Sequence, residues 1–222
     1  MAQPARAARH PHRNQDQKQI LHLVRTGGTL TRSTPRPRPA RWVRQHGPGG
    51  RRVRLERGGF VNAYPDGADH AWNAGGGCCG ELGRSDVDDV AFLSAVVAEA
   101  SRNTSIDPSK VYATGMSNGA MMAYRLACET TLFAAIAPVS GTMLVPCASP
   151  APVSVLHIHD TADRNVPYAG GEGEGVAHIN GPSIEPAVDS WRRVNLCGTN
   201  LTSTYRHPVT RTTVSCRGGA KR

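Results

Sequence analysis

The 222-residue chain has few aromatic residues, no long apolar run and no apolar segment near its start. No stretch approaches the ~20 consecutive apolar residues that a spanning helix needs, so we expect no membrane segment. The first residues lack the apolar region of a secretory signal peptide, so no export signal is visible. Aromatic residues make up 5% of the chain. Zinc-finger and helix-turn-helix patterns are absent, and we therefore expect no nucleic-acid partner.

Acidic residues are nearly absent from the first quarter of the chain. Residues 1–57 contain 14 Lys and Arg against Asp16 and Glu56, a net charge of +12. Residues 58–222 carry a net charge of −3, so the overall charge of +9 belongs to the N-terminal segment. The composition of residues 1–57 predicts a disordered or polyproline arm, with one short helix at Gln17–Arg25. We expect its deletion to leave the melting of a 58–222 domain unchanged.

Cys-x-x-Cys pairs are also absent, and no His stands at ligand spacing from a cysteine, so we expect no metal site. The even count of six cysteines favours disulfides in an oxidising compartment over free buried thiols. Six cysteines allow fifteen connectivities. Positions along the chain suggest Cys128 with Cys147 and Cys197 with Cys216. Cys78 and Cys79 then pair together or stay reduced.

Beyond Gly59 the pattern changes to strands alternating with helices. Two apolar runs, 133–139 and 153–159, lie after a run of helix formers, which is typical of a parallel sheet with helices on both faces. The expected strands are 60–64, 111–114, 133–139 and 153–159, with β-rich runs at 201–205 and 210–216, and the expected helices are 86–102, 120–126 and 185–195. The fold class predicted is α/β.

A Gly-x-Ser-x-Gly sequence, Gly115 to Gly119, lies between a β-rich run and a helical run. This context predicts a nucleophile elbow, in which a sharp turn lifts the Ser117 hydroxyl above the sheet. Gly115 and Gly119 stand where a Cβ would collide, and the backbone N–H of Asn118 can hold a developing oxyanion. The alternative is an ordinary glycine-rich turn with a capping serine.

A serine hydrolase of this architecture has its triad in the order Ser, acid, His. Asp163 follows a later apolar strand and is the expected acid, with Asp160 as its competitor. Trp72 and Asn73 precede a glycine-rich stretch, and we expect them to line a substrate mouth. The alternative is that Trp72 covers this loop for packing alone. The aspartates at positions 86, 88 and 89 open a predicted helix, where capping is favoured over metal binding.

Beyond these motifs, the chain resembles the secreted polyhydroxybutyrate depolymerase and feruloyl esterase group of α/β-hydrolases over residues 58–218. The matching residues are Tyr64-Pro65-Asp66-Gly67, Trp72-Asn73-Ala74-Gly75, Val87-Asp88-Asp89-Val90-Ala91-Phe92, Gly115-Met116-Ser117-Asn118-Gly119, Ala137-Pro138-Val139-Ser140-Gly141, His157-Ile158-His159, Thr161-Ala162-Asp163 and Val166-Pro167-Tyr168. The resemblance implies a secreted, cofactor-free serine esterase that acts on polyester or plant cell-wall ester through Ser117 and Asp163.

Three departures from that family bear on activity. Asp160 replaces a usual glycine, and His46-Gly47 follows Arg44-Gln45 rather than an apolar strand. The family's Gly-rich His segment with Trp-Pro-Gly is also missing, and we expect His178 and His207 to be surface residues rather than the base. These departures predict a hydrolase core truncated at both ends, an N-terminus read in the wrong frame, and impaired catalysis. The alternative is a non-catalytic binding protein with a basic arm.

Overall fold

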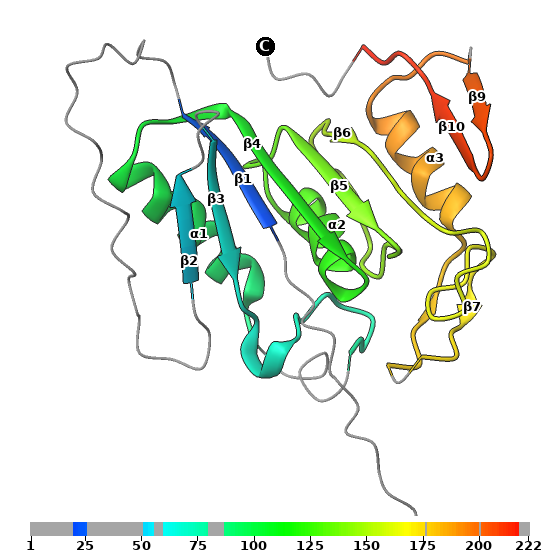
Figure 1. Ribbon diagram of the computed structural model, residues 1–222, viewed down its shortest axis with the longest axis horizontal. Coiled ribbons are helices and arrows are strands. Elements are labelled where there is room, and N and C mark those ends of the chain that lie inside the picture. The colour runs from blue at the N-terminus through cyan, green and yellow to red at the C-terminus, as the bar shows by residue number, and fades with distance from the viewer. Residues whose placement is uncertain are drawn as a thin grey trace, which may run out of the picture.

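A six-stranded mixed sheet forms the centre of the protein (Figure 1). The computed structural model describes residues 20–25, 51–55, 60–79, 87–175, 177–199 and 201–217. The sheet order is β2-β3-β1-β4-β5-β6. These strands are β1 Ile20–Arg25, β2 Arg51–Leu55, β3 Phe60–Pro65, β4 Ile106–Met116, β5 Ala135–Val139 and β6 Ser154–Val155. Strands β4, β5 and β6 run parallel, whereas β1, β2 and β3 pair antiparallel.

Two strands come from the segment that was expected to be disordered, and β1 stands where a short helix was expected. Leu21 of β1 lies opposite Ala63 of β3 on one side and Ala113 of β4 on the other. The expectation is therefore wrong for 20–25 and 51–55, because pairing with strands far along the chain overrides a weak local pattern. The rest of residues 1–57, including His46-Gly47, lies outside the described residues, and the boundary at residue 57 stays a prediction.

Helices α1 (Asp89–Asn103) and α2 (Asn118–Glu129) lie on one face of the sheet (Figure 1). Asp88 begins α1 as its N-cap, since its side chain accepts from the Ala91 N–H at 2.8 Å. Capping by Asp88 is therefore confirmed, and Asp86 lies outside the described residues. The apolar residues of α1 repeat at helical spacing and are buried against the sheet and α2: Leu93, Val96, Val97 and Ala100.

The third helix, α3 (Ile184–Val194), docks beside β6 (Figure 1). Its C-cap residue Asn195 is buried and bonds both backbone groups of Val153: Oδ1 accepts from the N–H at 3.0 Å and Nδ2 donates to the carbonyl at 2.8 Å. The three parallel strands with their flanking helices form the α/β-hydrolase core that the sequence predicted. Among the described residues, none of the helices is long and apolar enough to span a membrane.

Two disulfides confirm the suggested pairings, and a third joins Cys78 and Cys79, for which pairing and the reduced state had both been left open. Cys128–Cys147 links the end of α2 to the loop after β5, Cys197–Cys216 closes the base of a hairpin, and Cys78 bonds Cys79. The hairpin consists of β9 (Thr202–Arg206) and β10 (Val209–Thr213), all of whose residues are exposed. The short strands β7 (Gly171–Glu172) and β8 (Asn180–Gly181) form a further sheet, and Ala68–His70 form a 3₁₀ turn, η1.

Candidate active site

The junction between β4 and α2 has the geometry of a nucleophile elbow. Ser117 has φ 53° and ψ −118°, a conformation that non-glycine residues rarely adopt. A Cβ on Gly115 would lie 2.5 Å from the carbonyl carbon and oxygen of Gly119, so only glycine lets the strand and helix approach this closely. The strained backbone of Ser117 and the missing side chain at Gly115 together produce the sharp turn.

The end of β5 supports this turn from the adjacent strand. The Ser117 N–H donates to the Val139 carbonyl at 2.9 Å. A Cβ on Gly141 would lie 2.5 Å from Ala120 Cβ and 2.9 Å from the Ser117 carbonyl oxygen. Ser117 is therefore held by β4, β5 and α2 at the carboxyl ends of the parallel strands, where α/β proteins collect their chemistry.

Asn118, the first residue of α2, ties a distant loop to the elbow through its side chain. Its Oδ1 accepts from the Trp72 N–H at 2.7 Å, and its Nδ2 donates to the Trp72 carbonyl at 2.9 Å. Both bonds are buried, so they satisfy polar groups that would otherwise be costly to remove from water. The sequence pointed only to the backbone N–H of Asn118 as an oxyanion donor, and that role stays a prediction.

Trp72 is fully buried and packs against Phe92 of α1, with ring centroids 6.3 Å apart. The substrate-mouth interpretation of Trp72 is therefore wrong, and the packing alternative holds. Asn73 is half-buried, and its side-chain amide donates to the Val87 carbonyl at 3.1 Å. Trp72 anchors the loop to the core by burying its large ring, and Asn73 anchors it through its hydrogen bond to Val87.

Asp89 and Arg125 hold the same loop from the two helices. The buried Asp89 carboxylate accepts from the Asn73 N–H at 2.7 Å, and Arg125 donates to the Asn73 carbonyl at 2.6 Å. Burial raises the pKa of Asp89, and the Asn73 hydrogen bond and the Arg125 charge oppose that shift. The sequence suggested only helix capping for Asp89, since its loop partner lies in an earlier segment.

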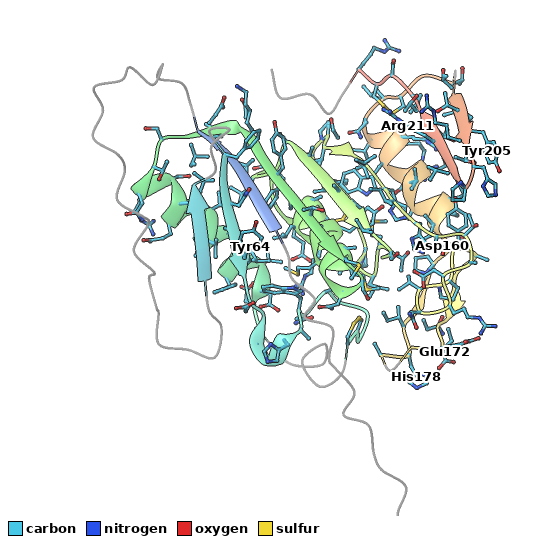
Figure 2. All side chains as sticks on the ribbon, viewed as in Figure 1. Tyr64, Asp160, Glu172, His178, Tyr205 and Arg211 are labelled. Carbon is cyan, nitrogen blue, oxygen red and sulfur yellow. A yellow bond between two sulfur atoms is a disulfide. The ribbon has the colours of Figure 1, made fainter. Side chains whose placement is uncertain are left out.

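Asp163 lies in a tight turn after β6. Its Oδ1 accepts from the N–H groups of Asn165 at 2.8 Å and Val166 at 3.0 Å, and its side chain is mostly buried. Its Oδ2 lies 3.7 Å from Nε2 of His159. The competitor Asp160 is exposed, and its carboxylate accepts from the Ala162 N–H at 2.9 Å (Figure 2). The geometry supports Asp163 over Asp160, and the catalytic role itself stays a prediction.

Two histidines that the sequence marked only as part of a motif join this turn to α2. The Tyr124 hydroxyl lies 2.8 Å from His157 Nδ1, and His157 Nε2 lies 3.1 Å from His159 Nδ1. His159 Nε2 lies 2.8 Å from the Val166 carbonyl oxygen. Burial, with the neighbouring His159, lowers the pKa of His157 to about 4. The sequence did carry one signal for this contact. His157 and His159 are two residues apart in an expected strand, and alternate residues of a strand share a face.

The two histidines considered as bases lie elsewhere. His178 is exposed and points away from the central sheet (Figure 2). Its Nδ1 lies 3.3 Å from Oε1 of Glu172. His207 lies in the exposed turn between β9 and β10, edge-to-face with Tyr205. Neither histidine lies on the six-stranded sheet that carries Ser117. Within the described part of the chain, no group of three or more His, Cys, Asp or Glu side chains is arranged to hold a metal.

These features define a protein with an α/β-hydrolase core and a nucleophile elbow. Residues 67–148 match the family model described as "Prolyl oligopeptidase family". The protein named "Putative esterase NocK" of Nocardia uniformis subsp. tsuyamanensis is 38% identical over 151 residues, which cover 61% of this chain and 43% of that protein. "Probable feruloyl esterase C" of Aspergillus clavatus is 31% identical over 119 residues, covering 53% and 40%.

A third relative, "Feruloyl esterase B" of Piromyces equi, is 29% identical over 152 residues, covering 63% of this chain and 27% of that protein. The chain thus spans less than half the length of each of these three relatives. No solved structure gives a significant match. The matches and the fold together make this chain a homologue of serine esterases of the α/β-hydrolase class.

Proposed function

We propose that this protein is a serine carboxylic-ester hydrolase that works through an acyl-enzyme on Ser117. The observation that carries the proposal is the Ser117 backbone, held at φ 53° and ψ −118° between a strand and a helix. Strained conformations of this kind persist where the surrounding structure fixes them, and they concentrate at functional sites. Gly115 and Gly141 leave room for the turn, which supports a presented nucleophile rather than a capping serine.

In this mechanism Ser117 Oγ attacks the ester carbonyl while a histidine removes its proton. The backbone N–H of Asn118, in the first turn of α2, stabilises the oxyanion of the tetrahedral intermediate. Asp163 orients the histidine and stabilises its charged form. Since Asp163 Oδ1 already accepts two backbone N–H groups, Oδ2 is the oxygen that this histidine would meet.

We further propose that the 222-residue chain is a slow esterase. Of the four histidines after Ser117, His157 and His159 use both ring nitrogens in bonds to each other, Tyr124 and Val166. His178 is exposed in the loop between β7 and β8, and His207 is exposed in the turn between β9 and β10. A missing general base commonly reduces rates by about 10²–10⁴-fold.

For the substrate, we propose a plant cell-wall ester of the feruloyl or acetyl-xylan type, or a polyhydroxyalkanoate. The names of the two feruloyl esterase relatives support the first class. We also propose that the protein acts outside the cell. Its three disulfides support this location, because such bonds form and persist in oxidising compartments.

The proposal is tested by labelling with a fluorophosphonate, which reacts only with an activated serine, and by p-nitrophenyl butyrate hydrolysis. We expect slow labelling that Ser117→Ala abolishes, and slow hydrolysis that His178→Ala and His207→Ala leave unchanged. Absence of labelling in the folded chain would contradict the esterase and favour a non-catalytic binding protein. Fast hydrolysis lost in one of the histidine variants would overturn the slow-enzyme proposal and identify the base.

A further inference from the structure

Three side chains outside the proposed triad connect the helix of Ser117 to the turn of Asp163. Tyr124 lies on α2 and is fully buried, and His157 and His159 follow β6. Their hydrogen bonds run without a gap from the Tyr124 hydroxyl through both imidazoles to the Val166 carbonyl. The two rings stack with centroids 5.2 Å apart and planes 13° apart.

The chemistry of the last acceptor fixes the direction of every bond. A carbonyl oxygen can only accept, so His159 must carry its proton on Nε2. A neutral imidazole has one donor and one acceptor nitrogen, so Nδ1 of His159 accepts from Nε2 of His157. Nδ1 of His157 then accepts, and the Tyr124 hydroxyl donates. With both rings neutral, one arrangement of protons satisfies all three bonds.

The last acceptor of this hydrogen-bond chain, the Val166 carbonyl, belongs to the same turn as Asp163. The residue whose carbonyl accepts from His159 is Val166, and the N–H of Val166 donates to Asp163 Oδ1 at 3.0 Å. Asp163 Oδ2 also faces the same His159 N–H at 3.7 Å. A negative oxygen near this nitrogen favours the same Nε2–H tautomer, so the loop and the histidine reinforce each other.

The near end lies on the helix that begins directly after Ser117. Tyr124 comes seven residues after Ser117, which is about two turns along α2. The hydrogen-bond chain therefore connects the helix that follows Ser117 with the turn that contains Asp163. More than thirty residues of backbone separate these two parts in the sequence. Catalytic groups need their mutual positions held closely, and a network of partly buried hydrogen bonds between side chains is suited to that purpose.

We propose that Tyr124, His157 and His159 are positioning residues that form a one-directional hydrogen-bond chain and hold the Asp163 turn against the Ser117 helix. This inference rests on the proposed function for its catalytic meaning. The hydrogen-bond chain itself stands on the geometry alone. It assigns the Nε2–H tautomer to both histidines.

Two-dimensional ¹⁵N–¹H spectra of the ¹⁵N-histidine-labelled full chain at pH 7 test the tautomers. We expect His157 and His159 both to show a protonated Nε2 and an unprotonated Nδ1. We expect Tyr124→Phe to shift the Nδ1 signal of His157. Tyr168→Phe is the matched control, since the Tyr168 ring also packs on His159 but its hydroxyl bonds Glu185. A proton on Nδ1 of His159 in the wild-type chain would overturn the proposal.

Amide hydrogen exchange tests the positioning itself. Phe at position 124 keeps the packing and removes one hydroxyl, so a merely structural Tyr124 would leave Val166 unaffected. We expect Tyr124→Phe to speed exchange of the Val166 N–H about three- to tenfold, and Tyr168→Phe to leave it unchanged. Unchanged exchange in Tyr124→Phe would contradict positioning. An unlabelled Ser117 with the expected tautomers and exchange would contradict only the esterase.

Discussion

At the scale of single residues, the elbow depends on positions that lack a side chain. Gly141 is one of them, because its missing Cβ makes room for Ala120 and the Ser117 carbonyl. We expect Gly141→Ala to lower the free energy of unfolding by about 1–3 kcal/mol, the usual cost of overpacking, and to slow fluorophosphonate labelling.

Gly198→Ala is the control for this change. A Cβ there would meet only the Ser215 carbonyl oxygen, at an ordinary 3.7 Å. Urea denaturation of both variants measures the difference in unfolding free energy. Equal stabilities of Gly141→Ala and Gly198→Ala would show that the close approach at the elbow is not required.

Protonation of His157 is a second consequence at the residue scale. Burial lowers its pKa to about 4 in the folded protein, against 6.5 for an ordinary histidine. Between these values the unfolded chain takes up a proton that the folded chain excludes, so stability should fall as the pH drops from 6.5 to 4. The titratable groups that contact this ring are His159 and Tyr124.

We expect His157→Gln, which can still donate and accept, to flatten the stability profile across this pH range. The exposed His178→Gln serves as the control and should leave the profile as it is in the wild-type chain. Denaturation midpoints at pH 7, 5.5 and 4.5 supply the comparison. A wild-type profile that is flat between pH 6.5 and 4.5 would contradict the prediction.

At the scale of elements, two disulfides of equal sequence separation have different consequences. Each joins cysteines 19 residues apart, so each restricts the unfolded chain by a similar amount, typically about 3 kcal/mol. Cys128–Cys147 connects the elbow helix to the loop after β5. Cys197–Cys216 closes an exposed hairpin that the central sheet does not include.

We expect the double variant Cys128→Ala, Cys147→Ala to lose about 2–4 kcal/mol of unfolding free energy. The double variant Cys197→Ala, Cys216→Ala should mainly loosen β9 and β10 and leave labelling of Ser117 unchanged. Thermal unfolding combined with labelling separates the two. Equal losses in both variants would show that the hairpin unfolds together with the core.

The sequence predicted the elements whose signal is local. Helix α1 begins near its aspartates, α2 begins within the Gly-x-Ser-x-Gly turn, and β9 and β10 lie within three residues of the expected runs. Strand β1 was mistaken for a helix, because a strand paired on both sides needs partners that no local window contains. The same limit applies to Trp72, whose burial depends on α1 and on Asn118.

In the candidate site too, the sequence predicted residues marked by a local signal and missed contacts between distant segments. Ser117 and Asp163 stood out because a motif and a strand end mark them, and both lie where a parallel sheet places its chemistry. The bond between Tyr124 and His157 joins a helix to the segment after β6, 33 residues along the chain. No sequence pattern indicates that contact, since it depends on how α2 packs against the sheet.

At the scale of the whole molecule, the sheet requires the N-terminal segment. Strand β1 separates β3 from β4, so its loss would leave both with unpaired backbone groups. We now expect deletion of residues 1–57 to abolish cooperative unfolding, contrary to the expectation from composition. Leu23→Pro, which removes one backbone donor within β1, should be strongly destabilising.

Ser203→Pro in β9 is the matched change, since that strand pairs only with β10. Calorimetry of the three variants measures the outcome. A deleted chain that melts as sharply as the full chain would show that β1 is dispensable. A Ser203→Pro chain as unstable as Leu23→Pro would remove the distinction between the two sheets.

The exposed hairpin β9–β10 has a practical consequence for protein engineering. Its strands pair with each other, its base is closed by Cys197–Cys216, and its turn at His207 faces solvent. A peptide tag or a second domain inserted at this turn would be attached through a covalently closed stem, insulated from the elbow. Surface immobilisation through such a graft should leave Ser117 as reactive toward a fluorophosphonate as in the free protein, which makes this turn the natural point for coupling the protein to a solid support.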